Sequence, residues 1–101
     1  MMLGELICLL EDLPQNKVVK FGFGHPHSYR GYYEDLSFSP EMNVTIGSML
    51  EHAKSALGQT FTGYKGGEFL MGEYTECWIS CYGSSGGDRI GPTLVKYWSE
   101  E

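Results

Sequence analysis

Apolar side chains recur every three or four residues between a threonine and a glycine near the middle of the chain, a spacing that gathers them on one face of a helix. The stripe consists of Ile46, Met49, Leu50, Ala53, Ala56 and Leu57. Thr45 can cap the first turn, and Gly58 stands where a C-terminal glycine is expected. The sequence therefore predicts a helix over about residues 46–57, with an apolar face that must pack against another layer.

A second stripe of this kind lies at the start of the chain. Its members are Leu3, Leu6, Ile7, Leu10 and Leu13. Pro14 and the turn-forming residues after it end the pattern, so we expect a helix over about residues 2–12. The chain has 101 residues, enough for one hydrophobic core and too few for two. We therefore expect a single domain over residues 1–101.

The remaining apolar residues occur in short β-branched and aromatic runs, which predict strands. These runs cover residues 17–23, 32–39, 75–82 and 90–98. Pro40 should end the second run, and Pro92 should limit the last to an edge or a bulged start. Residues 24–31, rich in glycine and broken by a proline, should be irregular. The expected fold is α+β, with two helices on one face of an antiparallel sheet of about four or five strands.

Net charge and hydropathy exclude several classes of partner. The chain has 13 acidic and 7 basic residues, a formal net charge of -6. A field of this sign repels phosphate backbones, so we expect no nucleic-acid polymer as partner. No apolar run approaches the roughly 20 residues that span a bilayer, and acidic residues stand near the start, where a signal peptide would carry lysines. We expect no membrane partner and a cytoplasmic location.

Three cysteines, Cys8, Cys77 and Cys81, form no Cys-x-x-Cys pair. This pattern argues against a disulfide framework and against a structural zinc site. Cys77 and Cys81 are four residues apart, so on a strand they would share one face, and we expect buried, reduced thiols there.

Candidate ligand-binding residues are concentrated between residues 21 and 35. They are His25, His27, Tyr29, Arg30, Tyr32, Tyr33 and Glu34. An arginine offers a planar fork for phosphate or carboxylate, tyrosines offer stacking faces, and Glu34 or Asp35 could hold ribose hydroxyls. The combination is typical of a site for a nucleotide-like ligand. The alternative is a tyrosine-rich strand whose rings fill the core.

Two further glycine-containing loops carry positive charge. Tyr64 and Lys65 lie in the stretch 62–68, which lacks the spacing of a phosphate-binding loop. Arg89 follows the glycines of residues 86–87. We count Tyr64, Lys65 and Arg89 as supplementary ligand-binding residues, with a glycine turn and a solvated hairpin turn as the alternatives.

The His25-x-His27 spacing could place two imidazoles on one side of an extended segment, as in some metal sites. A third ligand would have to come from Glu34, His52 or Cys77, none of which has a matching spacing. We therefore expect no metal, no cofactor and no catalytic residue. His25 or His27 could still serve as acid and base in a small phosphodiesterase or nucleotide hydrolase.

Four strings of the sequence are distinctive. They are HSYRGYYEDL (27–36), NVTIGSML (43–50), TGYKGGE (62–68) and IGPTL (90–94). On these strings the chain resembles, over about residues 3–98, a family of small uncharacterised proteins encoded by tailed bacteriophages. By analogy, such proteins are similar to phage counter-defence sponges, which sequester the nucleotide signals of bacterial immunity.

The resemblance implies a non-enzymatic protein that binds and sequesters a nucleotide-derived small molecule in the host cytoplasm. A chain this small closes a pocket more easily with a second copy, so we expect a homodimer or a higher homo-oligomer. Two alternatives stay open. One is the hydrolase described above. The other is an inhibitor that occupies a basic site on a host factor with an acidic surface, made of Glu34, Asp35, Glu41, Glu73 and Glu76.

Overall fold

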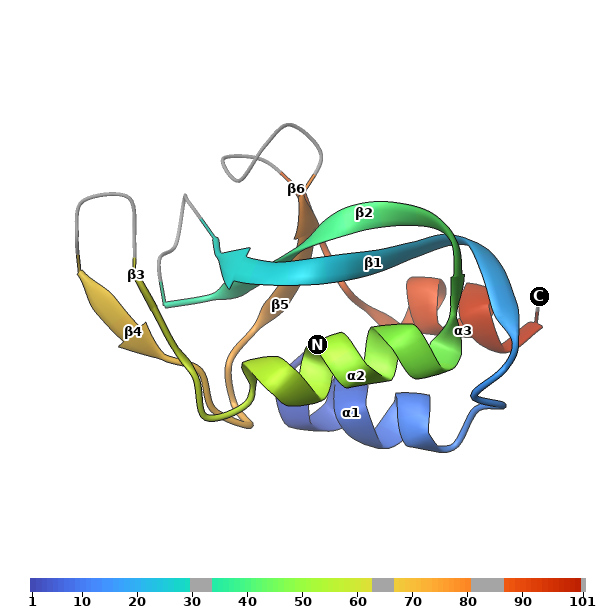
Figure 1. Ribbon diagram of the computed structural model, residues 1–101, viewed down its shortest axis with the longest axis horizontal. Coiled ribbons are helices and arrows are strands. Elements are labelled where there is room, and N and C mark those ends of the chain that lie inside the picture. Colours follow the sequence, from blue (N-terminus) through green and yellow to red (C-terminus); the bar gives the residue numbers. More distant parts are fainter. Residues whose placement is uncertain (30–33, 63–66, 81–86, 101) are drawn as a thin grey trace.

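The chain folds into helices and strands that alternate irregularly along the sequence. The computed structural model describes residues 1–29, 34–62, 67–80 and 87–100. In chain order its elements are α1 (Leu3–Glu11), β1 (Val18–Ser28), β2 (Leu36–Thr45), α2 (Ile46–Ala56), β3 (Thr60–Thr62), β4 (Glu68–Leu70), β5 (Cys77–Ser80), β6 (Gly87–Arg89) and α3 (Pro92–Glu100) (Figure 1). The expected α+β class is confirmed.

The strands divide into two sheets. The larger has the order β1-β2-β5-β6, and β3 and β4 form a separate antiparallel pair. β2 and β5 are parallel, whereas β1–β2 and β5–β6 are antiparallel. The single antiparallel sheet of about four or five strands that we expected is therefore wrong. Between β2 and β5 the chain passes through α2 and the β3–β4 pair, and such a long connection allows parallel pairing.

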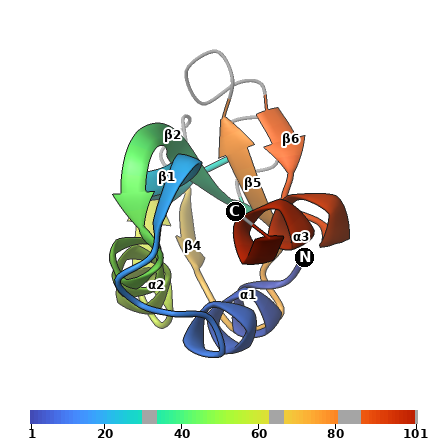
Figure 2. The ribbon, with the colours of Figure 1, turned by 90° about the vertical axis from the view of Figure 1, so that its right-hand side faces the viewer.

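The helices lie together on one side of the larger sheet (Figure 2). We call the side of the sheet that faces them the inner face and the opposite side the outer face. Alternate residues of β2 and β5 are buried on the inner face, namely Leu36, Phe38, Cys77 and Ile79. They belong to one hydrophobic core that also includes residues of all three helices. Phe23 and Phe38 both belong to this core, and their ring centroids lie 4.2 Å apart.

Both predicted helices are confirmed within a residue or two of their expected ends. In α1 the buried side chains are Leu3, Leu6, Ile7 and Leu10. At the start of α2 the Thr45 hydroxyl accepts a hydrogen bond from the Ser48 amide at 3.1 Å. Gly58 follows α2 with a φ of 82°, a left-handed conformation that favours glycine. The local capping signals thus predicted the ends of α2 correctly.

β1 is longer than we expected. It continues through Gly24, His25 and Pro26 to Ser28, a segment that we had expected to be irregular. The pairing register with β2 shifts between Gly24 and Pro26, and His25 has a φ of 32°. A β-bulge of this kind leaves one residue out of the ladder, so the strand can pass a proline without ending.

β2 also differs from the prediction, because it begins at Leu36 and continues past Pro40 to Thr45. Pro40 is paired with Phe23 of β1. β5 pairs only with residues 36–38 of β2. Beyond Phe38, therefore, one side of β2 has no partner strand among the described residues, and such an edge tolerates proline. Residues 32 and 33 of the predicted strand lie outside the described part of the chain.

The predicted last strand, residues 90–98, is wrong. Pro92 is the first residue of α3, a position where its fixed φ suits a helix and its missing N–H costs nothing. Trp98 is fully buried, and its indole N–H donates a hydrogen bond to the Phe21 carbonyl of β1 at 2.8 Å. The expected two-helix layer is thus a three-helix layer.

Candidate ligand-binding site

A row of four polar and aromatic residues crosses the larger sheet, one residue from each strand. His27 is paired with Ser37, Ser37 with Trp78, and Trp78 with Arg89. Side chains of paired residues on neighbouring strands project to the same face. Because Leu36, Phe38, Cys77 and Ile79 occupy the inner face, the row lies on the outer face. We call these four residues the outer row.

In the outer row, Trp78 contacts the side chains of Tyr29, Arg89 and Asp35. The Tyr29 ring stacks on it with a centroid distance of 4.5 Å and an interplanar angle of 9°. The Arg89 guanidinium lies 5.0 Å from the centre of the Trp78 ring, within the range of a cation–π contact. The Trp78 indole N–H donates to Asp35 Oδ2 at 3.0 Å. These contacts hold an aromatic ring, a cation and a carboxylate in one place.

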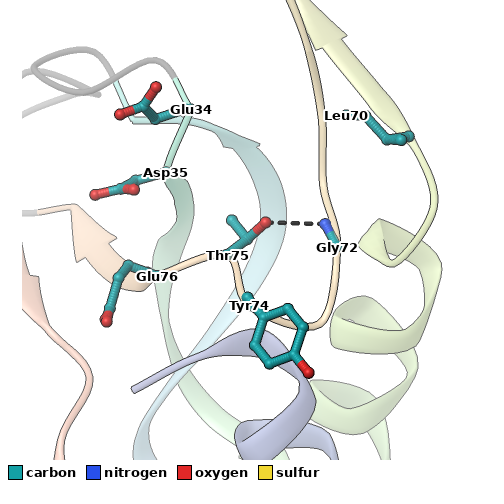
Figure 3. A pocket seen from close by; sticks show the side chains of 7 residues that line it. All are labelled: Glu34, Asp35, Leu70, Gly72, Tyr74, Thr75 and Glu76. Atoms are coloured by element: carbon teal, nitrogen blue, oxygen red, sulfur yellow. Dashed lines mark hydrogen bonds between the residues drawn. The ribbon is translucent and has the colours of Figure 1, made fainter.

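An open groove of about 450 Å³ borders this cluster. Its lining residues are Glu34, Asp35, Leu70, Gly72, Tyr74, Thr75 and Glu76. Figure 3 shows the three carboxylates along one side of the groove and Leu70 on the other. The Thr75 hydroxyl accepts a hydrogen bond from the Gly72 amide at 2.9 Å, which secures the turn before β5.

The groove shares two residues with the contacts around Trp78. Asp35 lines the groove and also accepts the Trp78 hydrogen bond. Glu76 lines it too, and its Oε2 lies 3.9 Å from Arg89 Nε and 3.1 Å from the Met1 amino group. Carboxylates accept hydrogen bonds from hydroxyl and N–H groups and repel phosphates. The groove therefore suits hydroxyl-rich or amino-bearing parts of a ligand. Among the side chains of the described residues near the groove, Arg89 is the one that could bind a phosphate.

Four of the predicted ligand-binding residues meet on or beside the outer face: His27, Tyr29, Glu34 and Arg89. Tyr29 is only 7% exposed, and its ring packs on the ring of Trp78. For this residue, therefore, the alternative interpretation, a ring that fills space inside the protein, is partly correct. Arg30, Tyr32, Tyr33, Tyr64 and Lys65 lie outside the described residues.

His25 does not belong to the outer row. Its side chain is exposed, and its Nε2 lies 3.6 Å from Glu41 Oε1. Its ring lies 5.4 Å from the ring of His52 in α2. His52 is partly buried, close to Gly24 at the bulge of β1.

The imidazole rings of His25 and His27 contact different groups. The Nδ1 atom of His27 contacts the His25 carbonyl at 3.2 Å, whereas the His25 ring is directed to Glu41 and His52. Within residues 1–29, 34–62, 67–80 and 87–100, no three His, Cys, Asp or Glu side chains are grouped so that they could hold a metal ion.

Cys77 is buried on the inner face, as we expected. Burial raises the pKa of its thiol from 9.0 to about 12. The positive charge of the Met1 amino group opposes this rise, whereas the carboxylates of Glu76 and Asp35 add to it. A thiol with this pKa is protonated at neutral pH and is a poor nucleophile. Cys81 lies outside the described residues.

Two residues of the site, Ser37 and Trp78, were not predicted from the sequence. The alternation of residues 77–79 contained a signal for Trp78: if Cys77 and Ile79 face the core, Trp78 faces away from it. Nothing in the sequence distinguished Ser37, because its importance depends on which strands lie on each side of it.

Comparison of the chain with models of protein families, with curated proteins and with solved structures gave no match. None of the helices in the described part of the chain has the length and apolar composition needed to cross a bilayer.

Proposed function

We propose that the protein binds a nucleotide-derived small molecule at the outer face of the larger sheet and holds it without turnover. The observation that carries the proposal is the cluster around Trp78, where Tyr29, Arg89 and Asp35 contact one indole ring. In its biological setting the protein would be a phage product in the host cytoplasm, acting as a homodimer or higher homo-oligomer and removing a signal of host immunity.

Each part of a nucleotide has a chemical counterpart in this region. Aromatic rings stack with bases, and an arginine binds phosphate through charge-assisted hydrogen bonds. The groove carboxylates of Glu34 and Asp35 can accept hydrogen bonds from ribose hydroxyls. The net charge of -6 favours one compact ligand over a polyanion, since a polymer would meet repulsion over the whole surface.

Calorimetry against cyclic dinucleotides and ADP-ribose derivatives tests the proposal. We expect Arg89→Ala to weaken binding by about 1.5–3 kcal/mol, because a charge-assisted hydrogen bond is lost. Lys54→Ala is the matched control. It removes the same charge from α2, where Lys54 pairs with Glu11 at 3.3 Å, and should leave binding unchanged. No binding by the unmodified protein at high protein concentration would contradict the proposal.

Recovery of the ligand after heat denaturation distinguishes sequestration from catalysis. A sequestering protein returns its ligand unchanged, whereas the alternative hydrolase, with His25 or His27 as acid and base, returns a product. Mass spectrometry of the released molecule gives the answer directly.

A second candidate function is inhibition of a host factor by an acidic surface. The observation that favours it is the groove itself, where Glu34, Asp35 and Glu76 lie beside the strongly exposed side chains of Leu70 and Tyr74. Carboxylates next to exposed apolar groups suit a basic protein partner. A pull-down from bacterial lysate at low and high salt tests it. A specific partner that is lost at high salt and with Tyr74→Ala would support this candidate, and the absence of any partner would contradict it.

A further inference from the structure

Exposed apolar side chains and lysines gather where β1 begins and α3 ends. We call this surface the basic end, and it consists of Lys17, Val18, Lys20, Phe21, Met42, Lys96 and Tyr97. Its four apolar side chains are between 38% and 64% exposed. Its lysines are three of the seven basic residues of the chain. Apolar side chains exposed together and bordered by charges are typical of an interaction surface.

Two hydrogen bonds join the segments that form the basic end. The Trp98 indole N–H of α3 donates to the Phe21 carbonyl oxygen of β1 at 2.8 Å. The Lys17 ammonium group, directly before β1, donates to the Ser99 carbonyl oxygen at 3.1 Å. These bonds hold the end of α3 against the start of β1, so side chains that are far apart in the sequence lie close together.

The groove beside Trp78 has the complementary chemistry. Glu34, Asp35 and Glu76 supply its carboxylates. Leu70 and Tyr74, which also line it, are 70% and 76% exposed. Lysines pair with carboxylates, and the apolar side chains of two such surfaces can be buried against each other. In Figure 1, β4, which ends at Leu70, lies toward one end of the long axis, and the start of β1 and α3 lie toward the other.

We propose that the protein forms a homodimer in which the basic end of each copy docks against the groove of the other. A two-fold axis can place two elongated copies antiparallel, so that both contacts form at once. The molecule measures 38 × 25 Å along its two longer axes, a side large enough for the about 800 Å² per copy of a standard interface. The inference goes beyond the proposed function, because it concerns how two copies join and does not depend on the ligand.

The salt dependence of dimerisation is the first test. Each copy has a formal net charge of -6, so added salt would strengthen the association of two copies that merely repel each other, by screening the repulsion. Contacts between lysines and carboxylates have the opposite dependence. We expect sedimentation equilibrium to show a dimer whose dissociation constant rises about tenfold from low to high salt. A dimer that becomes tighter with added salt would overturn the proposal.

Charge reversal tests the two surfaces separately. Lys20→Glu in the basic end and Glu34→Lys in the groove should each raise the dissociation constant of the dimer about tenfold. Lys54→Glu is the matched control, because it changes the net charge as Lys20→Glu does but lies in α2, where Lys54 pairs with Glu11. It should leave the dissociation constant unchanged, and thermal unfolding checks that each variant is folded. Equal effects of Lys20→Glu and Lys54→Glu would show that only net charge acts.

Zero-length cross-linking identifies the contact directly. A carbodiimide joins a lysine to a carboxylate only where the two are in contact, and a mixture of isotope-labelled and unlabelled protein distinguishes bonds between copies from bonds within one. We expect bonds between copies from lysines of the basic end to carboxylates of the groove. A monomer at high protein concentration, which leaves the groove open to a basic host protein, would overturn the proposal, and so would a dimer cross-linked through other surfaces.

Discussion

The Cys77 thiol is an acid whose pKa rises from 9.0 to about 12 on folding, chiefly through burial. Above pH 9 the unfolded chain loses this proton while the folded protein keeps it, so the free energy of unfolding should fall as pH rises toward 12. The expected slope approaches about 1.4 kcal/mol per pH unit. Urea unfolding between pH 8 and 11 measures it.

Cys77→Val isolates this contribution, because the variant has no thiol to titrate and its stability should fall less steeply above pH 9. Cys8→Ser, at an exposed position, should keep the slope of the unmodified protein. Parallel curves for the unmodified protein and Cys77→Val would contradict the role assigned to the buried thiol.

Gly22 is a second residue whose surroundings permit a sharp prediction. A Cβ atom at this position would lie 2.5 Å from Val44 Cγ2 and 2.7 Å from Met49 Sδ. The glycine therefore lets β1 approach its neighbours closely. We expect Gly22→Ala to lower the free energy of unfolding by about 1–3 kcal/mol through overpacking. Gly72→Ala, where a Cβ would meet nothing within 4 Å, should be nearly neutral, and equal effects of the two substitutions would disprove the close approach.

At the scale of the elements, α2 depends on a single side-chain cap. Thr45→Ala removes the hydroxyl that accepts from the Ser48 amide and should cost about 1 kcal/mol in a chemical unfolding experiment. Ser55→Ala, at an exposed position in the same helix, should change stability by less than about 0.5 kcal/mol. A Thr45→Ala protein as stable as the unmodified one would mean that the cap contributes nothing.

The docking of α3 depends on Trp98. Trp98→Phe keeps an aromatic ring but loses the hydrogen bond to the Phe21 carbonyl, which should cost about 1–3 kcal/mol because that acceptor is left without its donor. Trp98→Ala also leaves a large cavity and should cost about 3–5 kcal/mol. Thr93→Ala, at an exposed site of the same helix, serves as control. If Trp98→Ala behaves like that surface substitution in thermal unfolding, α3 does not pack as described.

The contrast between α2 and α3 indicates which elements could be predicted. α2 carries an apolar stripe with a cap on each side, so short-range signals define it. α3 contains Val95, Tyr97 and Trp98, which favour strands locally. Its helical state depends on burying Trp98 against β1, and a contact between residues so distant in sequence is not visible in the pattern.

For the whole molecule, the homodimer stays a prediction that the size of the chain favours. Phe21 and Met42 are paired across β1 and β2, and both are exposed. Light scattering after size exclusion should give twice the monomer mass. Met42→Glu, which adds a charge beside Phe21, should shift the mass toward the monomer if this pair lies in the interface. A monomer mass for the unmodified protein at high concentration would contradict the expected dimer.

The sequence by itself determined the α+β class, α1, α2 and the buried state of Cys77. Periodicity, capping residues and apolar runs are patterns within a few neighbouring residues, so they can be recognised without knowledge of the tertiary structure. It also placed His27, Tyr29, Glu34 and Arg89 among the ligand-binding candidates on chemistry alone. The tertiary structure decided the rest. Strand register brought His27, Ser37, Trp78 and Arg89 into one row, and a bulge at His25 let β1 continue past Pro26. Register and bulges depend on which segments pair, and the choice among pairings is made by the burial of the whole core, a long-range effect that no local pattern contains.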